Sequence, residues 1–348
     1  MTEELNPKRT EISQYGEFGL IDYLTKDLSL QNDSTKLGVG DDAAIMEYGD
    51  RQTLATTDLL LEGIHFDLSY CPLKHLGYKS AIVNFSDIYA MNGRPTQLLV
   101  SVGISKRFSV EDVAELYDGM RAACEAYGVD MVGGDTSASL TGLTLSLTCI
   151  GEVEKGKAVT RSGAQKNDLI CVTGDLGAAY MGLQLLEREK RIFKGEKDFS
   201  PAFEGHEYLL QRQLRPEARK DIVEAFAQKG ILPTAMMDVS DGLSSELLHI
   251  CKHSDCGCRV YEEKIPIDYE TASLCEEMNM NLSTAALNGG EDYELLFTVP
   301  LALHERMEEW RQVRVIGYIC DKSEGARLVT RDGNEIDIIA QGWNHMEK

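Results

Sequence analysis

Apolar residues recur along this chain at two spacings, and the two spacings alternate. Near-helical spacing predicts a first helix across residues 18–28, in which the apolar positions are Phe18, Ile21, Leu24 and Leu28. Short runs rich in β-formers predict strands at QTLATTD, TQLLVSVGI, LTLSLTCIGEV, LICVTG, TAMMDVS and YELLFTV. The alternation indicates a protein of the α/β class.

A second and clearer helix is predicted from Ser109 to Tyr127. Ser109 has the side chain of an N-cap, and Asp112 lies three residues later, as in a capping box. Gly128 supplies the stop signal. The apolar stripe of this helix consists of Val113, Leu116, Met120 and Cys124.

The chain of 348 residues has the length of two domains, and we place the boundary near residue 153. There LTLSLTCIGEV gives way to EKGKAVTRSGAQKND, which opens a new set of strand and helix signals. The predicted domains are 1–153 and 154–348. The polar stretch EREKRIFKGEKDFSPAFEGHE is interpreted as a surface insertion or irregular helix, with helical signals resuming at Pro216 and ending at Gly230.

Composition is that of a soluble globular protein, with 43% hydrophobic and 26% charged residues. The start MTEELNPKRTEIS lacks the basic and apolar parts of a secretory signal, and no apolar run approaches the roughly 18 residues of a membrane span. Nine scattered cysteines, an odd number, suit thiols in a reducing compartment. We therefore expect a cytoplasmic protein with no membrane partner.

The net charge of −22 repels phosphate backbones and anionic lipids at long range, so we expect no nucleic-acid partner. A phosphorylated ligand would need added positive charge, for which a divalent metal is the obvious candidate.

The candidate chemistry lies in aspartates that come at the exits of apolar runs, usually beside glycine. They are Asp41 and Asp42 in GVGDDAA, Asp58 in LATTD, Asp135 after VDMVGG, and Asp238 and Asp241 in DVSDG. Asp87 in NFSDIYAM adds a carboxylate one helical turn after Asn84. Because strand exits open onto one edge of an α/β sheet, we expect these carboxylates to converge.

Converging carboxylates repel one another and resist ionisation unless cations neutralise them. Oxygen ligands without an accompanying Cys and His set select magnesium, manganese or calcium, and magnesium also takes phosphate oxygens as ligands. The aspartates therefore predict a metal site for nucleotide phosphates. A single Asp beside Gly more often marks a turn or helix cap, so the prediction depends on the whole set.

Other nucleotide signatures are missing from the sequence. It contains no G-x-x-x-x-G-K-[ST], and the glycines of VTGDLGAAYMG do not form G-x-G-x-x-G. That glycine run is interpreted as a turn with close helix packing, with a phosphate-facing helix start as the alternative.

The ordered motifs GDDAA, TTDLLLEGIHF, NFSDIYAMNGRP, GGDT, MDVSDG and GGEDYEL resemble the thiamine-monophosphate kinase family. Its superfamily also holds aminoimidazole ribonucleotide synthetase, selenophosphate synthetase and a hydrogenase-maturation protein. The resemblance runs from GEFGLI at residue 16 to the closing GW. It implies two α/β domains with mixed sheets, N-terminal sheets that pair in a homodimer, and a nucleotide held in a cleft by acidic loops.

The resemblance also implies an activity and a set of site residues. The activity is in-line transfer of the γ-phosphoryl group of ATP to thiamine monophosphate, which gives thiamine diphosphate. Several magnesium ions assist, and no side chain acts as nucleophile. The implied magnesium ligands are Asp42, Thr56, Thr57, Asp58, Asp87, Asp135, Asp238 and Asp241. The implied ATP contacts are Tyr117, Gly134, Asp135, Arg161 and Ser240, and the implied thiamine phosphate contacts are His65, Glu291 and Trp343.

Plain structural alternatives exist for several of these residues. Arg161 could bind phosphate through two parallel hydrogen bonds or form a surface ion pair, and His65 could be a hydrogen-bonded structural imidazole. Trp343 could stack on the cationic ligand or be buried in the hydrophobic core. Glu291 could accept a hydrogen bond from the amino group of the acceptor or pair with its positive charge.

The cluster HICKHSDCGC, which spans His249 to Cys258, has residues typical of zinc sites. Its spacing matches no standard zinc pattern, and it is interpreted as a helix end followed by a turn. In NFSDIYAMNGRP, Asn92 stands where family members often have Gly, and ALNGGEDYEL has Asn where many have Phe. Both departures concern packing more than ligands.

Two rival functions remain open at this point. One is a relative in the same superfamily that acts on another acceptor, although the chain has no cysteine before Cys71, where the selenophosphate branch usually carries a reactive one. The other is a non-catalytic nucleotide or magnesium sensor, which would use the same carboxylates. Only turnover separates a sensor from an enzyme.

Overall fold

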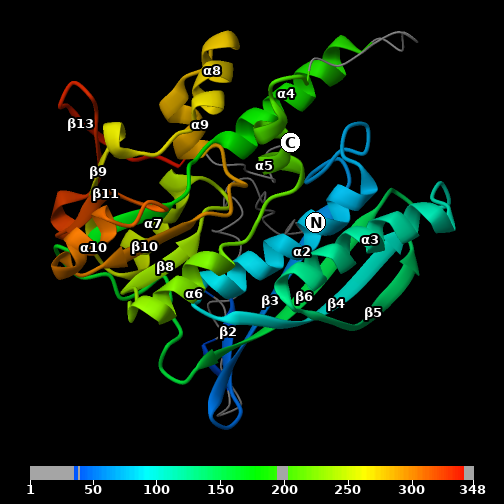
Figure 1. Cartoon of the computed structure of the whole chain (residues 1–348), viewed down its shortest axis with the longest axis horizontal. Coiled ribbons are helices and arrows are strands. Elements are labelled where there is room, and N and C mark those ends of the chain that lie inside the picture. The colour runs from blue at the N-terminus through cyan, green and yellow to red at the C-terminus, as the bar shows by residue number, and fades with distance from the viewer. Residues whose placement is uncertain (1–34, 38–39, 194–202, 341–348) are drawn as a thin grey trace, which may run out of the picture.

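The computed structural model describes residues 35–37, 40–193 and 203–340. The helix predicted across residues 18–28 and Trp343 lie outside the described residues. Within them the chain forms two mixed sheets with helices against them, as the family resemblance implied (Figure 1).

The first sheet has the strand order β1-β2-β3-β6-β4-β5, in which only β4 and β5 are parallel neighbours. Its strands are β1 (Thr35–Leu37), β2 (Ala44–Glu47), β3 (Arg51–Leu61), β4 (Arg94–Ile104), β5 (Asp130–Ala138) and β6 (Thr144–Glu154). The helices α2 (Leu73–Ala90) and α3 (Val110–Tyr127) cover one face (Figure 1). Leu54, Leu98 and Leu147 point toward these helices and are fully buried.

No helix or strand of the described residues covers the opposite face of this sheet. Leu59, Leu99 and Val132 are 53%, 37% and 56% exposed there.

The second sheet has the order β13-β12-β9-β11-β7-β10-β8. Its strands are β7 (Leu169–Thr173), β8 (Ala235–Asp238), β9 (Gly257–Tyr261), β10 (Leu295–Val299), β11 (Val313–Cys320), β12 (Ala326–Val329) and β13 (Glu335–Asp337). Strands β7 and β10 are buried at every position, because α7 (Leu243–His253) packs on one face and α6 (Lys220–Lys229) and α10 (His304–Glu308) pack on the other. Burial on both faces explains their continuous apolar runs.

Further helices are α4 (Ala178–Ile192), α5 (Glu207–Leu214), α8 (Tyr269–Glu277) and α9 (Leu282–Asn288), with 3₁₀ turns at η2 (Glu262–Lys264), η3 (Leu301–Leu303) and η4 (Lys322–Glu324). Gly177 begins α4 with φ of 84°, and a Cβ on Gly182 would lie 2.2 Å from the carbonyl oxygen of Leu209. These two glycines confirm the predicted turn and close helix packing. Of the helices that the structure describes, none combines the length and apolarity needed to cross a lipid bilayer.

The predicted helix from Ser109 is confirmed in detail. Ser109 and Asp112 form the capping box, and Gly128 ends α3 in the left-handed conformation with φ of 71°. The interpretation of the polar stretch before Pro216 was wrong in part, because α4 continues to Ile192 and α5 already begins at Glu207. Amphipathic packing of both helices, with Leu185 and Leu209 buried, outweighs the polar sequence.

Two aspartates were expected at strand exits and lie inside strands instead. Asp58 is followed by three more residues of β3, and Asp135 lies in the middle of β5. The strands continue because the neighbouring strands pair with them beyond these positions, as Leu61 does with Thr144 and Ala138 with Ile104.

The two sheets meet along α2, which contacts β8 as well as the strands of the first sheet. Tyr293, from the second half of the chain, is buried in the core of the first sheet. Glu217 accepts hydrogen bonds from the hydroxyls of Tyr78 and Tyr127 at 2.8–3.0 Å. These contacts fix the junction where the predicted site residues gather.

Candidate active site

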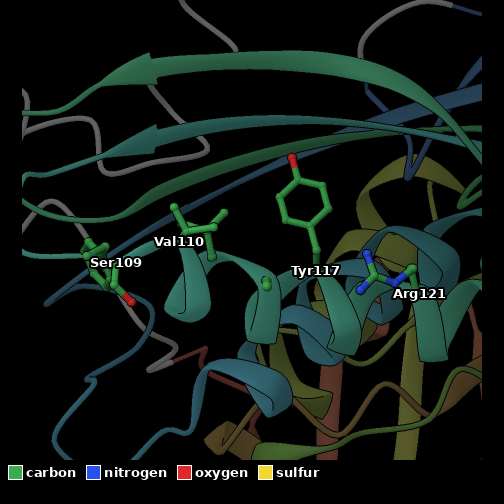
Figure 2. Close-up of a pocket in the computed structure, with 7 residues that line it drawn as sticks. Ser109, Val110, Tyr117 and Arg121 are labelled. Carbon is green, nitrogen blue, oxygen red and sulfur yellow. The ribbon is translucent and has the colours of Figure 1, made fainter.

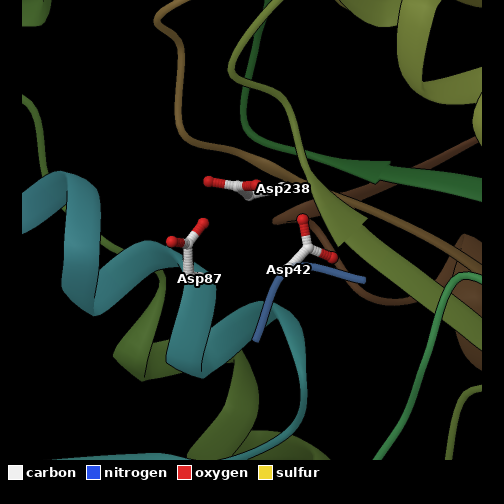
Figure 3. Close-up of side chains that lie close together, drawn as sticks. All are labelled: Asp42, Asp87 and Asp238. Atoms are coloured by element: carbon white, nitrogen blue, oxygen red, sulfur yellow. The ribbon is translucent and has the colours of Figure 1, made fainter. Parts of the chain in front are cut away.

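Three carboxyl groups meet at the junction of the two sheets. Asp42 lies between β1 and β2, Asp87 on α2, and Asp238 at the end of β8, and one oxygen from each lies within 4.8 Å of the others (Figure 3). This is the convergence that the sequence predicted. We call these three residues the carboxylate cluster.

Hydroxyl groups hold two members of the cluster. Thr56 donates from Oγ1 to Oδ2 of Asp87 at 2.6 Å, and Ser86 donates from Oγ to Oδ2 of Asp238 at 2.5 Å. The predictions did not include Ser86, although it directly precedes Asp87 and its hydroxyl joins α2 to β8. Asp58 shares a face of β3 with Thr56, and its Oδ2 is buried without a hydrogen-bond partner.

Burial and mutual repulsion disfavour ionisation of these acids. The pKa of Asp87 is raised well above its usual value, first by desolvation and then by repulsion from Asp58 and Asp238. Desolvation, followed by repulsion from Asp42, raises the pKa of Asp238. Desolvation also raises the pKa of Asp58.

The donor set fits magnesium. All its candidate ligands are oxygens, they converge, and Asp58 contributes an orphaned buried oxygen that a cation would satisfy. Among the described residues no other group of three or more His, Cys, Asp or Glu could hold a metal. The segment from His249 to Cys258 is the end of α7, a turn and the start of β9, as predicted.

Arg161 supplies positive charge directly beside the cluster. Its Nη2 donates to Oδ1 of Asp42 at 2.6 Å, and its backbone N–H donates to Asp41. The Arg161 side chain is only 16% exposed, so it forms the ion pair of the structural alternative in the interior and not on the surface. Desolvation and repulsion from Asp42 raise the pKa of Asp41 to about 7, against the opposing effect of Arg161.

Ser240 and Asp241 form the loop between β8 and α7. Oε1 of Glu246 accepts from the backbone N–H of Ser240 at 3.2 Å and of Asp241 at 2.8 Å. Glu246 is 1% exposed, and its Oε2 has no hydrogen-bond partner. The predictions did not include Glu246. The only feature of the sequence that could have indicated it is its position as an acidic residue in the first turn of the helix after DVSDG.

Thr57 and Asp135 are among the predicted metal ligands that the structure does not bring into the cluster. The hydroxyl of Thr57 points to the uncovered face of the first sheet, where it contacts the carbonyl oxygen of Leu147 and Oγ1 of Thr148. Asp135 is exposed on the edge strand β5, beside Ser101. Its neighbour Gly134 must be glycine, because a Cβ there would lie 1.7 Å from the carbonyl oxygen of Val100.

Tyr117 borders a hollow of about 450 Å³ over α3 (Figure 2). Val110 and Tyr117 project from one side of the helix in this view. The hollow is lined by Phe108, Ser109, Val110, Val113, Ala114, Tyr117 and Arg121. The hollow is largely open to solvent, and its walls are mostly apolar.

His65 and Glu291 each have structural contacts of their own. Nδ1 of His65 accepts from the backbone N–H of Leu61 at 3.0 Å, which fits the structural-imidazole alternative and directs the proton to Nε2. Glu291 forms an ion pair with Lys79, with Nζ and Oε1 2.9 Å apart, and accepts from Nε2 of Gln213 at 2.8 Å. The predictions included neither Lys79 nor Gln213.

Comparisons with known proteins give a consistent result. Residues 40–153 match the model of the AIR synthase related protein N-terminal domain, and residues 165–329 match that of its C-terminal domain. The chain is 37% identical to the thiamine-monophosphate kinase of Aquifex aeolicus over 334 residues, which covers 96% of this chain and 99% of that one. It is 33% identical to the thiamine-monophosphate kinase of Bacillus subtilis over 341 residues, at 95% and 99% coverage.

A solved structure has a similar fold. AaThiL complexed with AMPPCP and TMP superposes with a TM-score of 0.81 at 35% identity, covering 97% of this chain and 99% of that one.

Proposed function

This chain belongs to the thiamine-monophosphate kinase family, and from that premise we propose that it transfers the γ-phosphoryl group of ATP to thiamine monophosphate. The observation that carries the proposal is the carboxylate cluster at the junction of the sheets, beside Arg161. The complex of AaThiL with an ATP analogue and TMP supports the same pair of substrates.

In the proposed reaction, a phosphate oxygen of thiamine monophosphate attacks the γ-phosphorus of ATP in line. The bond from the γ-phosphorus to the bridging oxygen breaks, and ADP leaves with that oxygen. An acceptor phosphate is already nucleophilic at neutral pH, so no side chain has to remove a proton. The main obstacle is repulsion between two anions.

The chain's own residues address this repulsion. Asp42, Asp58, Asp87 and Asp238 would hold magnesium ions, with the hydroxyl of Thr56 fixing Asp87. Bound magnesium would offset the negative charge of both phosphates. Arg161, which lies beside the cluster, would bind phosphate oxygens through its planar guanidinium group, and Glu246 holds the Ser240 and Asp241 loop in place.

The remaining substrate contacts are assigned from the resemblance. The hollow beside Tyr117 would take the adenine part of ATP, with Gly134 and Asp135 on the neighbouring strand. His65, Glu291 and Trp343 would contact thiamine monophosphate. Thr57, Asp135 and Asp241 complete the proposed magnesium ligands, Thr57 through its main-chain oxygen because its hydroxyl faces away.

We also propose a cytoplasmic homodimer with domains 1–153 and 154–348. The uncovered face of the first sheet, with Leu59, Leu99 and Val132 exposed, supports pairing through that sheet. Strand β6 ends at Glu154 and β7 begins at Leu169, which supports a boundary in this region. A single species of monomer mass in light scattering at micromolar concentration would contradict the dimer.

The direct test is incubation of the protein with ATP, magnesium and thiamine monophosphate, followed by chromatography of the thiamine esters. We expect thiamine diphosphate and ADP in equal amounts. No thiamine diphosphate, together with consumption of another phosphorylated acceptor, would assign the chain to a different activity within the superfamily. Nucleotide binding without turnover of any acceptor would favour a sensor.

A further inference from the structure

Glu291 is held in one orientation by groups that no substrate assignment includes. Its backbone has φ of 59°, a left-handed conformation that is costly for a residue with a side chain, and its N–H donates to the carbonyl oxygen of Ser240 at 2.7 Å. This bond places Glu291 directly beside the loop of the carboxylate cluster. Its side chain is 32% exposed, so part of the carboxylate remains open to a ligand.

Lys79 is the main partner of this carboxylate. Its side chain is 7% exposed, on a part of α2 that is otherwise buried. Nζ lies 2.9 Å from Oε1 of Glu291 and donates to the main-chain oxygen of Gln213 at 3.0 Å. Lysine is rarely buried without a charged partner, so Glu291 and Lys79 form a pair that depends on both members.

Gln213 completes the arrangement from α5. Its Nε2 donates to Oε2 of Glu291 at 2.8 Å, while its main-chain oxygen accepts from Lys79. Each oxygen of Glu291 therefore has one protein donor, and the direction of its remaining lone pairs is fixed. A carboxylate with fixed lone pairs recognises a hydrogen-bond donor in one place.

Lys79 also decides what kind of group Glu291 recognises. An ammonium group at 2.9 Å already balances the negative charge of Glu291, so a second cation there would be repelled by Lys79. A neutral N–H donor meets no such repulsion. This argument separates the two parts of thiamine monophosphate, a cationic thiazolium ring and a neutral aminopyrimidine.

We propose that Lys79 and Gln213 are positioning residues that make Glu291 recognise the amino group of the acceptor's pyrimidine and not its positive charge. The inference rests on the proposed function, because it concerns the acceptor of that reaction. It predicts discrimination against acceptors that carry an oxygen in place of the amino group.

The test compares thiamine monophosphate with oxythiamine monophosphate, in which a carbonyl replaces the amino group. Dissociation constants from calorimetry, as well as KM and kcat, are measured for the full chain and for K79M, Q213L and E291Q. The control K166M removes a lysine from an exposed ion pair with Asp321 in the second half of the chain. The melting temperature and the KM for ATP report on any general damage.

We expect the parent to bind the oxo analogue about tenfold or more weakly, which is the scale of one hydrogen bond to a charged group. K79M should weaken binding of thiamine monophosphate about tenfold and reduce the ratio between the dissociation constants of the oxo analogue and thiamine monophosphate. The KM of K79M for ATP should stay within about twofold of the parent's. Q213L should act in the same direction. Adding K79M to E291Q should change acceptor binding little, because Lys79 acts through the carboxylate.

Equal binding of the two acceptors by the parent would overturn the inference, as would a K79M variant that behaves like K166M. If K79M fails to fold, the parent's discrimination and the Q213L variant still decide the question. Because binding is measured without turnover, acceptor binding with no thiamine diphosphate formed would refute the proposed function alone. No acceptor binding at all would refute both.

Discussion

Two groups of buried acidic side chains in this protein differ in what balances their charge. In the carboxylate cluster, Asp42, Asp87 and Asp238 lie together with Asp58 nearby, and among these four acids only Asp42 forms an ion pair with Arg161 in the described part of the chain. The second group, which we call the arginine-paired cluster, contains Asp175, Asp292 and Glu294 together with Arg212 and Arg219.

The three acids of the arginine-paired cluster each lie close to an arginine of the protein. Arg212 lies 3.5 Å from Asp292 and 3.3 Å from Glu294, and Arg219 forms a second ion pair with Glu294. Asp292 also accepts from the backbone N–H of Gly177 at 2.7 Å, at the positive end of α4. These acids hold α4 and α5 against the GGEDYEL segment.

Among the described residues, the carboxylate cluster has more acids than cations that pair with them. The contrast indicates that charge paired inside the chain serves the fold, and charge left for an outside cation serves the ligand. The contrast between the two clusters predicts that some substitutions reduce stability and that others reduce activity.

The largest expected effect is on stability and concerns Arg212→Met. Removing this cation leaves Asp292 and Glu294 buried with less compensation, which should lower the free energy of unfolding by about 3–5 kcal/mol. Denaturant titration measures the loss. In the matched control Arg327→Met, the lost ion pair with Asp337 is exposed, and the change should stay below about 1 kcal/mol. Similar losses in the two variants would remove the contrast between the clusters.

The second prediction concerns Asp87→Asn, and here activity falls while stability does not. The nearly isosteric amide removes a metal ligand, so activity should drop about a hundredfold or more, with partial recovery at high magnesium. Relief of repulsion from Asp58 and Asp238 should offset any lost hydrogen bonding, so the variant should melt at or above the parent's temperature. Near-normal turnover with unchanged magnesium dependence would show that Asp87 is not part of the site.

The sequence predicted the members of the carboxylate cluster better than it predicted the reason they converge. Asp238 does end a strand and Asp87 does lie one turn after Asn84 in a helix, but Asp58 lies inside β3. The packing of α2 between the two sheets brings them together, and this packing depends on contacts between distant parts of the chain that no local pattern encodes. Capping and glycine signals around α3, which are local, were read correctly.

The residues that the predictions missed share one property. Ser86, Lys79, Gln213 and Glu246 act by holding another residue, across 5 to 212 positions in the sequence. A serine or glutamine inside a helix has no motif that marks such a partner. Their identification requires the tertiary contacts.

A third prediction uses pH. Burial raises the pKa of Asp41 to about 7 and raises those of Asp87 and Asp238, so between about pH 4 and 7 the folded state binds more protons than the unfolded state. The metal-free protein should therefore become less stable as pH rises through this window. Asp292 contributes in the same direction, because burial raises its pKa to about 7 against the effect of Arg212.

Magnesium separates the two clusters in this experiment. It binds the deprotonated carboxylate cluster, so its stabilising effect should be larger at pH 8 than at pH 5.5, while the contribution of Asp292 should not respond to it. Melting curves at both pH values, with and without magnesium, measure the difference for the parent and for Asp87→Asn. A magnesium effect that is equal at both pH values would contradict the prediction.

The smallest expected effect comes from two neighbouring threonines on opposite faces of β3. The hydroxyl of Thr56 donates to Asp87 inside the site, whereas that of Thr57 contacts Leu147 and Thr148 on the uncovered face. Valine has nearly the same shape as threonine and lacks the hydroxyl, so each substitution removes one set of hydrogen bonds and little else.

Thr56→Val should lower activity about tenfold, the scale of one hydrogen bond to a charged group, and raise the magnesium requirement. Thr57→Val should keep activity within about twofold, because a main-chain ligand does not depend on the side chain. Equal losses in both variants would place both hydroxyls in the site and contradict the alternation of β3.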